Sequence, residues 1–289
     1  MTYKSLVAVA SGGADDGVLL HAAAGLAAKA AAHLTIVPAF PDPAADYVYY
    51  GAVLSRGLAA RAMAAIEESE REQMERLGAL ARTAASRAGL ALSDTVETGP
   101  SLFLDKRALN PIVAVSDASL FSDLMMFSAV AAGARLSLSE VFAATLLFDR
   151  APILVVRDER PVLEARVAIA WDASAQAARA VRAALPLLIA APAITLIQHA
   201  KGLTEEQAEA ADPARISRYL ARHGAPAPSV RATDGAREGE AILEAAKDAH
   251  CGVLVAGAYG RSRLHEMVLG GASRAFVQAA DGPHLLLAH

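Results

Sequence analysis

The sequence predicts an α/β protein made of two similar halves, each a parallel sheet with helices on both faces. Short apolar runs alternate with alanine-rich segments of helical periodicity, and this alternation occurs twice along 289 residues. The chain is 54% hydrophobic and 20% charged, which excludes disorder. Its net charge of −4 gives no electrostatic case for nucleic acid or an anionic membrane, and no apolar stretch is long enough to span a bilayer. The lone cysteine, Cys251, excludes an intrachain disulfide framework and fits the cytoplasm.

Each half begins and ends with a short apolar run. These runs are residues 6–10 and 153–156 in the first half, and residues 167–170 and 285–288 in the second. The charged residues 158–161 between them form a natural linker. We therefore predict two domains, residues 1–158 and residues 163–289.

The second half shows the alternation clearly. Apolar positions recur with helical spacing from Ala177 to Leu188 and predict one helix there. Asp212 followed by Pro213 marks the start of another helix, and Gly224 marks its end. Further strands are predicted at residues 194–197, 230–232 and 253–256, and further helices at residues 239–249 and 272–280. Strands that alternate with helices predict a parallel sheet.

The first half repeats this plan with distortions. Its second helix is long, residues 54–88, with the acidic residues 67–70 on its solvent side. A third helix is predicted at residues 102–109, a fourth strand just before Ser116, and a long loop at residues 117–138. That loop holds an apolar cluster, which we interpret as a covered core segment, with a partner contact or a lid as alternatives. The cluster consists of Met125, Met126 and Phe127.

The residues that indicate chemistry follow the fourth strand of the second half. Gly257 and Gly260 stand in the loop after that strand, and Gly270 and Gly271 precede the next helix. Glycine lets the backbone approach a phosphate closely, and a helix N-terminus offers unpaired N–H groups. Asp172 ends the first strand and faces the same crevice, where its carboxylate can accept hydrogen bonds from a ribose hydroxyl or an adenine amine. Nearby cationic side chains are Arg261, Arg263 and Arg274.

The spacing Gly257-x2-Gly260-x9-Gly270 resembles the ATP-binding signature of the universal stress proteins, and residues 257–264 and 167–172 are similar to that family. The order of elements extends the likeness over the whole chain, which therefore resembles a tandem universal stress protein. This resemblance implies two Rossmann-like doubly wound domains, each a five-stranded parallel sheet of order 3-2-1-4-5. It also implies that the two domains pair through their final strands, as an intramolecular pseudo-dimer.

The resemblance implies a ligand as well, ATP or the related ADP or AMP, with Mg²⁺ as its optional companion. Asp172 would contact the adenosine part, and the three signature glycines would contact the phosphates. Gly271 stands where the family has serine or threonine, and Ser273 is the candidate to supply that hydroxyl instead. The function implied is that of a cytoplasmic stress-response or signalling protein with little or no catalytic turnover, although weak ATP hydrolysis is compatible with it.

The first half lacks the corresponding residues. Alignment of the two halves places Gly12 opposite Asp172, Ser116 opposite Gly257, Ser119 opposite Gly260, Ser139 opposite Gly270 and Glu140 opposite Gly271. The loop from Ser116 to Ser139 is also longer, at 23 positions against 13 in the second half. A carboxylate at position 140 repels phosphate. We therefore expect one nucleotide site per chain, in the second half.

Two other functions stay open. Residues 11–16, SGGADD, resemble the phosphate loop of the PP-loop ATP pyrophosphatases, except that Asp16 replaces the usual hydroxyl. Alternatively, the chain is an interaction module without a ligand, which the glycine at position 271 favours. None of the eight histidines has the spacing of a metal site. A homodimer and the identity of a signalling partner are not determined by the sequence.

Overall fold

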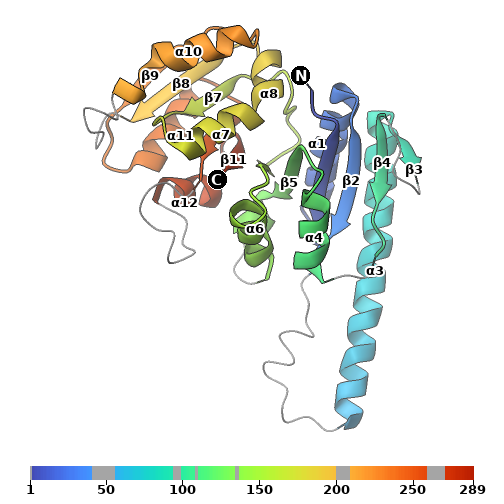
Figure 1. Cartoon of the computed structure of the whole chain (residues 1–289). Coiled ribbons are helices and arrows are strands. Elements are labelled where there is room, and N and C mark those ends of the chain that lie inside the picture. Colours follow the sequence, from blue (N-terminus) through green and yellow to red (C-terminus); the bar gives the residue numbers. More distant parts are fainter. Residues whose placement is uncertain are drawn as a thin grey trace.

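The computed structural model describes residues 2–40, 56–93, 99–107, 110–133, 137–199, 209–258 and 271–289, without the side chains of residues 56–63, 66, 137 and 138. The strands of these residues form one eleven-stranded sheet of order β3-β4-β2-β1-β5-β6-β11-β10-β7-β8-β9 (Figure 1). The first half contributes β1 (Ser5–Ala10), β2 (His33–Pro38), β3 (Ala91–Ser93), β4 (Ser101–Leu104), β5 (Leu124–Ser128) and β6 (Ile153–Val156). The second half contributes β7 (Val167–Ala170), β8 (Ile194–His199), β9 (Ser229–Thr233), β10 (Val253–Gly257) and β11 (His284–Ala288).

The two halves of the sheet join through their final strands. β6 and β11 pair antiparallel, with Leu286 opposite Leu154, whereas the other pairings are parallel. Both strands are fully buried. Because each half would otherwise expose an unpaired apolar edge strand, the join protects both edges.

Helices cover both faces of the sheet, as predicted for a doubly wound fold. One face carries α1 (Asp16–Ala30), α3 (Arg56–Ala88), α7 (Ala175–Ala183), α8 (Leu185–Ala190) and α10 (Pro213–Arg222). The other face carries α4 (Pro111–Ser119), α5 (Ala129–Gly133), α6 (Ser137–Leu147), α11 (Glu238–Asp248) and α12 (Gly271–Gln278). The predicted α/β class is therefore confirmed. Not one helix within the described ranges combines the length and the apolar character that crossing a membrane requires.

The predicted strand order is confirmed in the second half, where β9-β8-β7-β10-β11 corresponds to 3-2-1-4-5. The first half differs, because a sixth strand, β3, lies outside β4 at the edge of the sheet. β3 is three residues long and mostly exposed, so it carries no apolar run that would mark it in the sequence.

Two predictions in the middle of the first half are wrong. Residues 101–104 form strand β4 rather than a helix, and the residues just before Ser116 belong to helix α4 rather than to a strand. Asn110 accepts a hydrogen bond from the Ile112 N–H at 3.0 Å, and Pro111 occupies the first helical position. These are strong helix-start signals, and they override the β-branched character of the residues that follow.

The fourth strand of the first half is therefore β5, within the predicted loop at residues 117–138. Met125, Met126 and Phe127 are fully buried in it, which confirms the core interpretation and rules out a lid. Phe127 packs edge-on against Phe142 of α6, with ring centroids 5.4 Å apart.

The single helix predicted from Ala177 to Leu188 is two helices, α7 and α8. Pro186 lies in the first turn of α8 and cannot donate the hydrogen bond that a continuous helix requires. Elsewhere in the second half, Asp212 caps α10 by accepting a hydrogen bond from the Ala214 N–H at 2.9 Å, as predicted.

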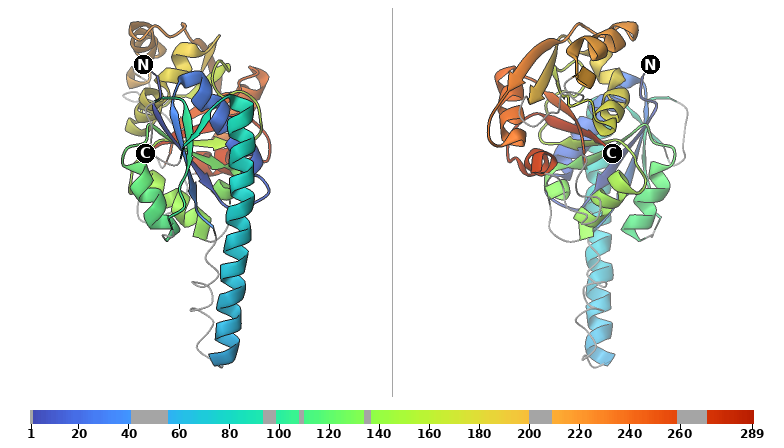
Figure 2. Two further views of the ribbon diagram at one scale, coloured as in Figure 1. Left: turned by 90° about the vertical axis from the view of Figure 1, so that its right-hand side faces the viewer. Right: turned by 60° about the vertical axis from the view of Figure 1, so that its left-hand side comes forward.

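Helix α3 extends well beyond the sheet (Figure 2). Its C-terminal half packs against α1 through buried residues, among them Leu77 and Ala81. The acidic residues 67–70 are exposed on the projecting part, as predicted.

Candidate functional site

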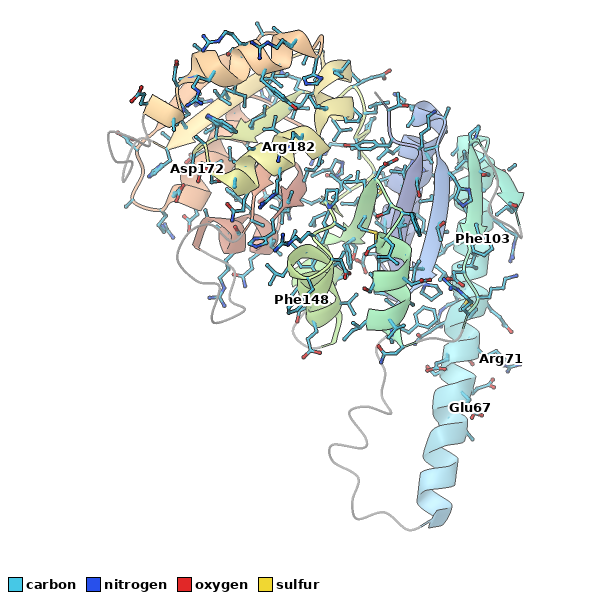
Figure 3. All side chains as sticks on the ribbon, viewed as in Figure 1. Glu67, Arg71, Phe103, Phe148, Asp172 and Arg182 are labelled. Atoms are coloured by element: carbon cyan, nitrogen blue, oxygen red, sulfur yellow. The ribbon has the colours of Figure 1, made fainter. Side chains whose placement is uncertain are left out.

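The turn after β7 holds Asp172 at the carboxyl end of the sheet (Figure 3). Its Oδ1 accepts a hydrogen bond from the Ser174 N–H at 2.9 Å, and Ser174 Oγ caps α7 by accepting from the Ala177 N–H at 3.1 Å. Ala173 between them has a φ of +56°, which is rare for a residue with a side chain. Asp172 is exposed, and within the described part of the chain nothing donates to its Oδ2. The turn therefore fixes one carboxylate oxygen and leaves the other for a ligand.

Gly257, the last residue of β10, lies against the first turn of α7. A Cβ atom at this position would be 2.5 Å from Ala177 N and 2.8 Å from Gln176 C. No side chain fits in that space, so the glycine allows α7 to start directly beside the end of β10. The structure thus brings Asp172 and Gly257 to the carboxyl ends of two neighbouring parallel strands, and it gives Gly257 a packing role that is independent of any phosphate.

Helix α12 begins at Gly271, which is exposed and has open space where a Cβ would be. The first N–H groups of a helix lack partners within it, so this end can receive an anion. Ser273 instead shares the buried face of α12 with Phe276 and Val277. Arg274 is exposed on the same helix. Four other predicted site residues lie outside the described residues, namely Gly260, Arg261, Gly270 and Arg263.

The matching turn of the first half already contains an anion. The carboxylate of Asp16 accepts hydrogen bonds from the Gly12 N–H at 2.8 Å, the Ser11 N–H at 3.0 Å and Ser11 Oγ at 3.2 Å. Asp16 is only 2% exposed, and its burial raises the pKa of this carboxyl although the N–H donors oppose the rise. The Asp16 side chain therefore already accepts the backbone hydrogen bonds that a phosphate would need.

The structure also corrects the alignment of the two halves. The residue with positive φ after the first strand is Gly12 in one half and Ala173 in the other, so Ser11 rather than Gly12 stands opposite Asp172. The end of β5 places Ser128 opposite Gly257. The predicted counterparts Ser116 and Ser119 belong instead to helix α4.

The region after β5 differs from the glycine loop of the second half. Ser128 Oγ accepts a hydrogen bond from the Ala131 N–H at 3.0 Å, so α5 begins directly at the strand end. Ser139 follows Ser128 by 11 positions, against 13 from Gly257 to Gly270, and the expectation of a longer loop is therefore wrong. Glu140 lies in the first turn of α6, where its negative charge disfavours a bound phosphate.

Sequence reasoning missed the buried cluster that ties the linker to the second half. The His284 side chain is fully buried, its Nδ1 lies 3.2 Å from the Arg157 N–H, and its Nε2 lies 3.1 Å from Arg160 O. Burial lowers the pKa of His284. The Arg157 guanidinium donates to the carbonyl oxygens of Pro283, Phe276 and Ala279, and therefore caps the end of α12.

No protein-family model matches this chain, and no curated protein matches it. Solved structures do match over nearly its whole length. A universal stress protein from Archaeoglobus fulgidus DSM 4304 has a TM-score of 0.64 and 16% identity, and the match covers 98% of this chain and 97% of that one. A putative universal stress protein from Pseudomonas aeruginosa UCBPP-PA14 has a TM-score of 0.52 and 14% identity, covering 99% and 93%. A functionally unknown protein from Pseudomonas aeruginosa PAO1 has a TM-score of 0.54 and 14% identity, covering 99% and 92%.

These matches confirm the resemblance that the sequence predicted. The chain has the fold of the universal stress proteins, and the fold occurs twice in tandem along it.

Proposed function

We propose that the second half binds an adenine nucleotide, ATP or a close relative, and that the chain acts in stress response or signalling in the cytoplasm with little or no turnover. One observation carries this proposal. The turn of Asp172, the end of β10 at Gly257 and the open start of α12 all belong to the carboxyl edge where β7 and β10 are neighbours. The chain leaves β7 in one direction and β10 in the other, and ligands of doubly wound sheets bind at such switch points.

Each residue has a role in this proposal that follows from its chemistry. Asp172 Oδ2 accepts hydrogen bonds from the ribose or the adenine amine. The N–H groups at the start of α12, Ser273 included, receive the phosphates, and Arg274 adds positive charge. Gly260, Gly270, Arg261 and Arg263 complete the proposed phosphate loop, with Mg²⁺ as a companion of the nucleotide.

Two carboxylates of the first half support a single site per chain. In the first half, Asp16 fills the loop amides and Glu140 stands in the first turn of α6. The occupied amides also argue against the pyrophosphatase alternative, because that chemistry requires the loop to hold a phosphate.

The interaction-module alternative has one observation in its favour. Large apolar side chains are exposed on and around the helices α4, α5 and α6 of the first half. They are Ile112, Val113, Leu120, Phe121, Val130 and Phe148. Exposed apolar groups of this size are typical of surfaces that contact other proteins.

Equilibrium binding of radiolabelled ATP tests the proposal. Gly271→Glu places a carboxylate at the start of α12, where open space accepts the side chain, and we expect a loss of affinity of tenfold or more. Gly25→Glu is the matched control, because Gly25 is also an exposed helical glycine with open space around it. Calorimetry should give one ATP per chain. Absence of binding, equal affinity of the two variants, or a stoichiometry of two would contradict the proposal.

A further inference from the structure

A cavity lies between helices α7 and α10, beside the turn that holds Asp172. Its volume is about 350 Å³, at the lower end of the range for small-molecule sites. The side chains that define its chemistry are Trp171, Val181, Arg182, Arg215, Ile216 and Tyr219. Gly257 and Gly271, the described glycines of the proposed site, are not among its lining residues.

The cavity extends from the carboxyl edge of the sheet along α7. Trp171 and Ala173, on either side of Asp172, line one end, and Arg182, in the last turn of α7, lines the other (Figure 3). The nine residues of α7 span roughly 13 Å. The α12 helix, which begins where the phosphates are proposed to bind, packs on the opposite face of the sheet. The cavity therefore adjoins the Asp172 end of the proposed nucleotide site and lies away from its phosphate end.

The lining offers a flat apolar surface. Trp171 and Tyr219 supply aromatic rings, and Val181 and Ile216 supply aliphatic surface. The Trp171 Nε1–H is fully buried, so the indole meets the cavity through its ring surface rather than through its N–H group.

The lining is also positively charged. Neither Arg182 nor Arg215 pairs with a carboxylate within 4 Å in the described ranges, and Arg215 makes only a long hydrogen bond of 3.4 Å to Ala210 O. Guanidinium groups bind carboxylates through paired hydrogen bonds.

We propose that this cavity binds a small organic anion with a flat apolar body, of the aryl carboxylate class. The ring of the ligand packs on Trp171 and Tyr219, and its carboxylate pairs with Arg182 and Arg215. This site adjoins the Asp172 end of the proposed nucleotide site and does not include the start of α12.

A single reporter group makes the proposal testable. Trp171 is the only tryptophan of the chain, so ¹⁵N-labelled protein gives one indole N–H signal in NMR. Titration with 2-naphthoate should shift this signal saturably, with a dissociation constant below a millimolar. The uncharged analogue 2-naphthalenemethanol, which has the same ring system, should bind at least tenfold more weakly.

Double variants test whether Arg182 and Arg215 bind the carboxylate of the ligand. The double variant Arg182→Gln with Arg215→Gln should weaken 2-naphthoate binding at least tenfold. The control pair Arg179→Gln with Arg218→Gln, on the same two helices but outside the cavity, should leave the affinity within twofold. A signal that does not shift, equal binding of the uncharged analogue, or equal losses in the two variant pairs would overturn the proposal. Gly271→Glu should leave 2-naphthoate binding unchanged, so the failure of either site is visible separately.

Discussion

The turns after the first strands of the two halves both contain a residue of positive φ, but they use their aspartates differently. In the first half the turn closes around the Asp16 carboxylate, which takes up the N–H groups of Ser11 and Gly12. In the second half the Asp172 carboxylate uses only Oδ1 within the turn and faces the solvent. The turn of the first half requires no bound anion, because the Asp16 carboxylate already accepts its N–H hydrogen bonds. The position of one aspartate, inside the turn or at its rim, thus distinguishes a structural turn from a candidate binding turn.

The largest difference in the effect of a substitution on stability is expected between the ends of β5 and β10. Gly257→Ala forces a Cβ atom against the backbone of α7, at 2.5 Å from Ala177 N, and we expect a loss of about 3 kcal/mol in the free energy of unfolding. Ser128→Ala, at the matching position, removes only the cap of α5 and should cost about 1 kcal/mol. Urea denaturation of both variants measures this difference, and equal losses would show that the close approach of α7 is not required.

The next effect concerns the two aspartates. Asp16→Asn replaces one acceptor oxygen by a donor in a buried site, which leaves N–H groups unpaired, and should cost about 2 kcal/mol. Asp172→Asn keeps an acceptor for the Ser174 N–H at an exposed position and should cost well under about 1 kcal/mol. Thermal unfolding monitored by circular dichroism checks both values. A stable Asp16→Asn protein would mean that the first turn tolerates an empty anion site.

A smaller effect should depend on pH. The first residue of the final strand is Ile153 in the first half and His284 in the second. Only the second half therefore has a titratable side chain at this position. Burial lowers the pKa of His284 below its usual value of 6.5, so the native state binds fewer protons than the unfolded state. Stability should therefore be full above the unfolded pKa and decrease as the pH falls below about 6.5. Urea midpoints between pH 7.5 and 5 should decrease less in His284→Gln, and an identical decrease would assign the pH dependence to other groups.

The smallest effect is expected at the two residues of positive φ. Ala173→Gly relieves a left-handed alanine and should stabilise the protein by no more than about 1 kcal/mol. Gly12→Ala should destabilise it, because φ is +79° there and a Cβ would lie 2.9 Å from Gln73 Oε1. Calorimetric melting temperatures that shift in the same direction in both variants would contradict this comparison.

Most of the second half could be predicted from its sequence, because helices such as α10 have clear start and end signals, although the break between α7 and α8 was missed. Asp212 and Pro213 mark the start of α10 by residue type alone, and Gly224 marks its end. The first half contains the same signal at Asn110 and Pro111, but the β-branched residues after it suggest a strand. Periodicity cannot distinguish a short buried helix from a strand in such apolar runs.

The candidate site could be predicted only where chain order decides it. Asp172 and Gly257 follow adjacent parallel strands and therefore meet at one edge. The contact of Asp16 with Ser11 and the place of Ser273 on the buried face of α12 depend on backbone geometry that a sequence pattern does not contain. The cavity between α7 and α10 depends on the packing of residues from separate helices, and no motif marks it.

Because β6 pairs antiparallel with β11, the peptide that links the two halves is not needed to hold them together. Arg157 is anchored to the end of α12, and Tyr3 Oη donates to Ala183 O across the halves at 2.8 Å. A proteolytic nick at residues 158–161 should therefore leave the two fragments associated as a native complex. Two separately expressed fragments should likewise assemble by strand complementation, each supplying the edge that the other lacks.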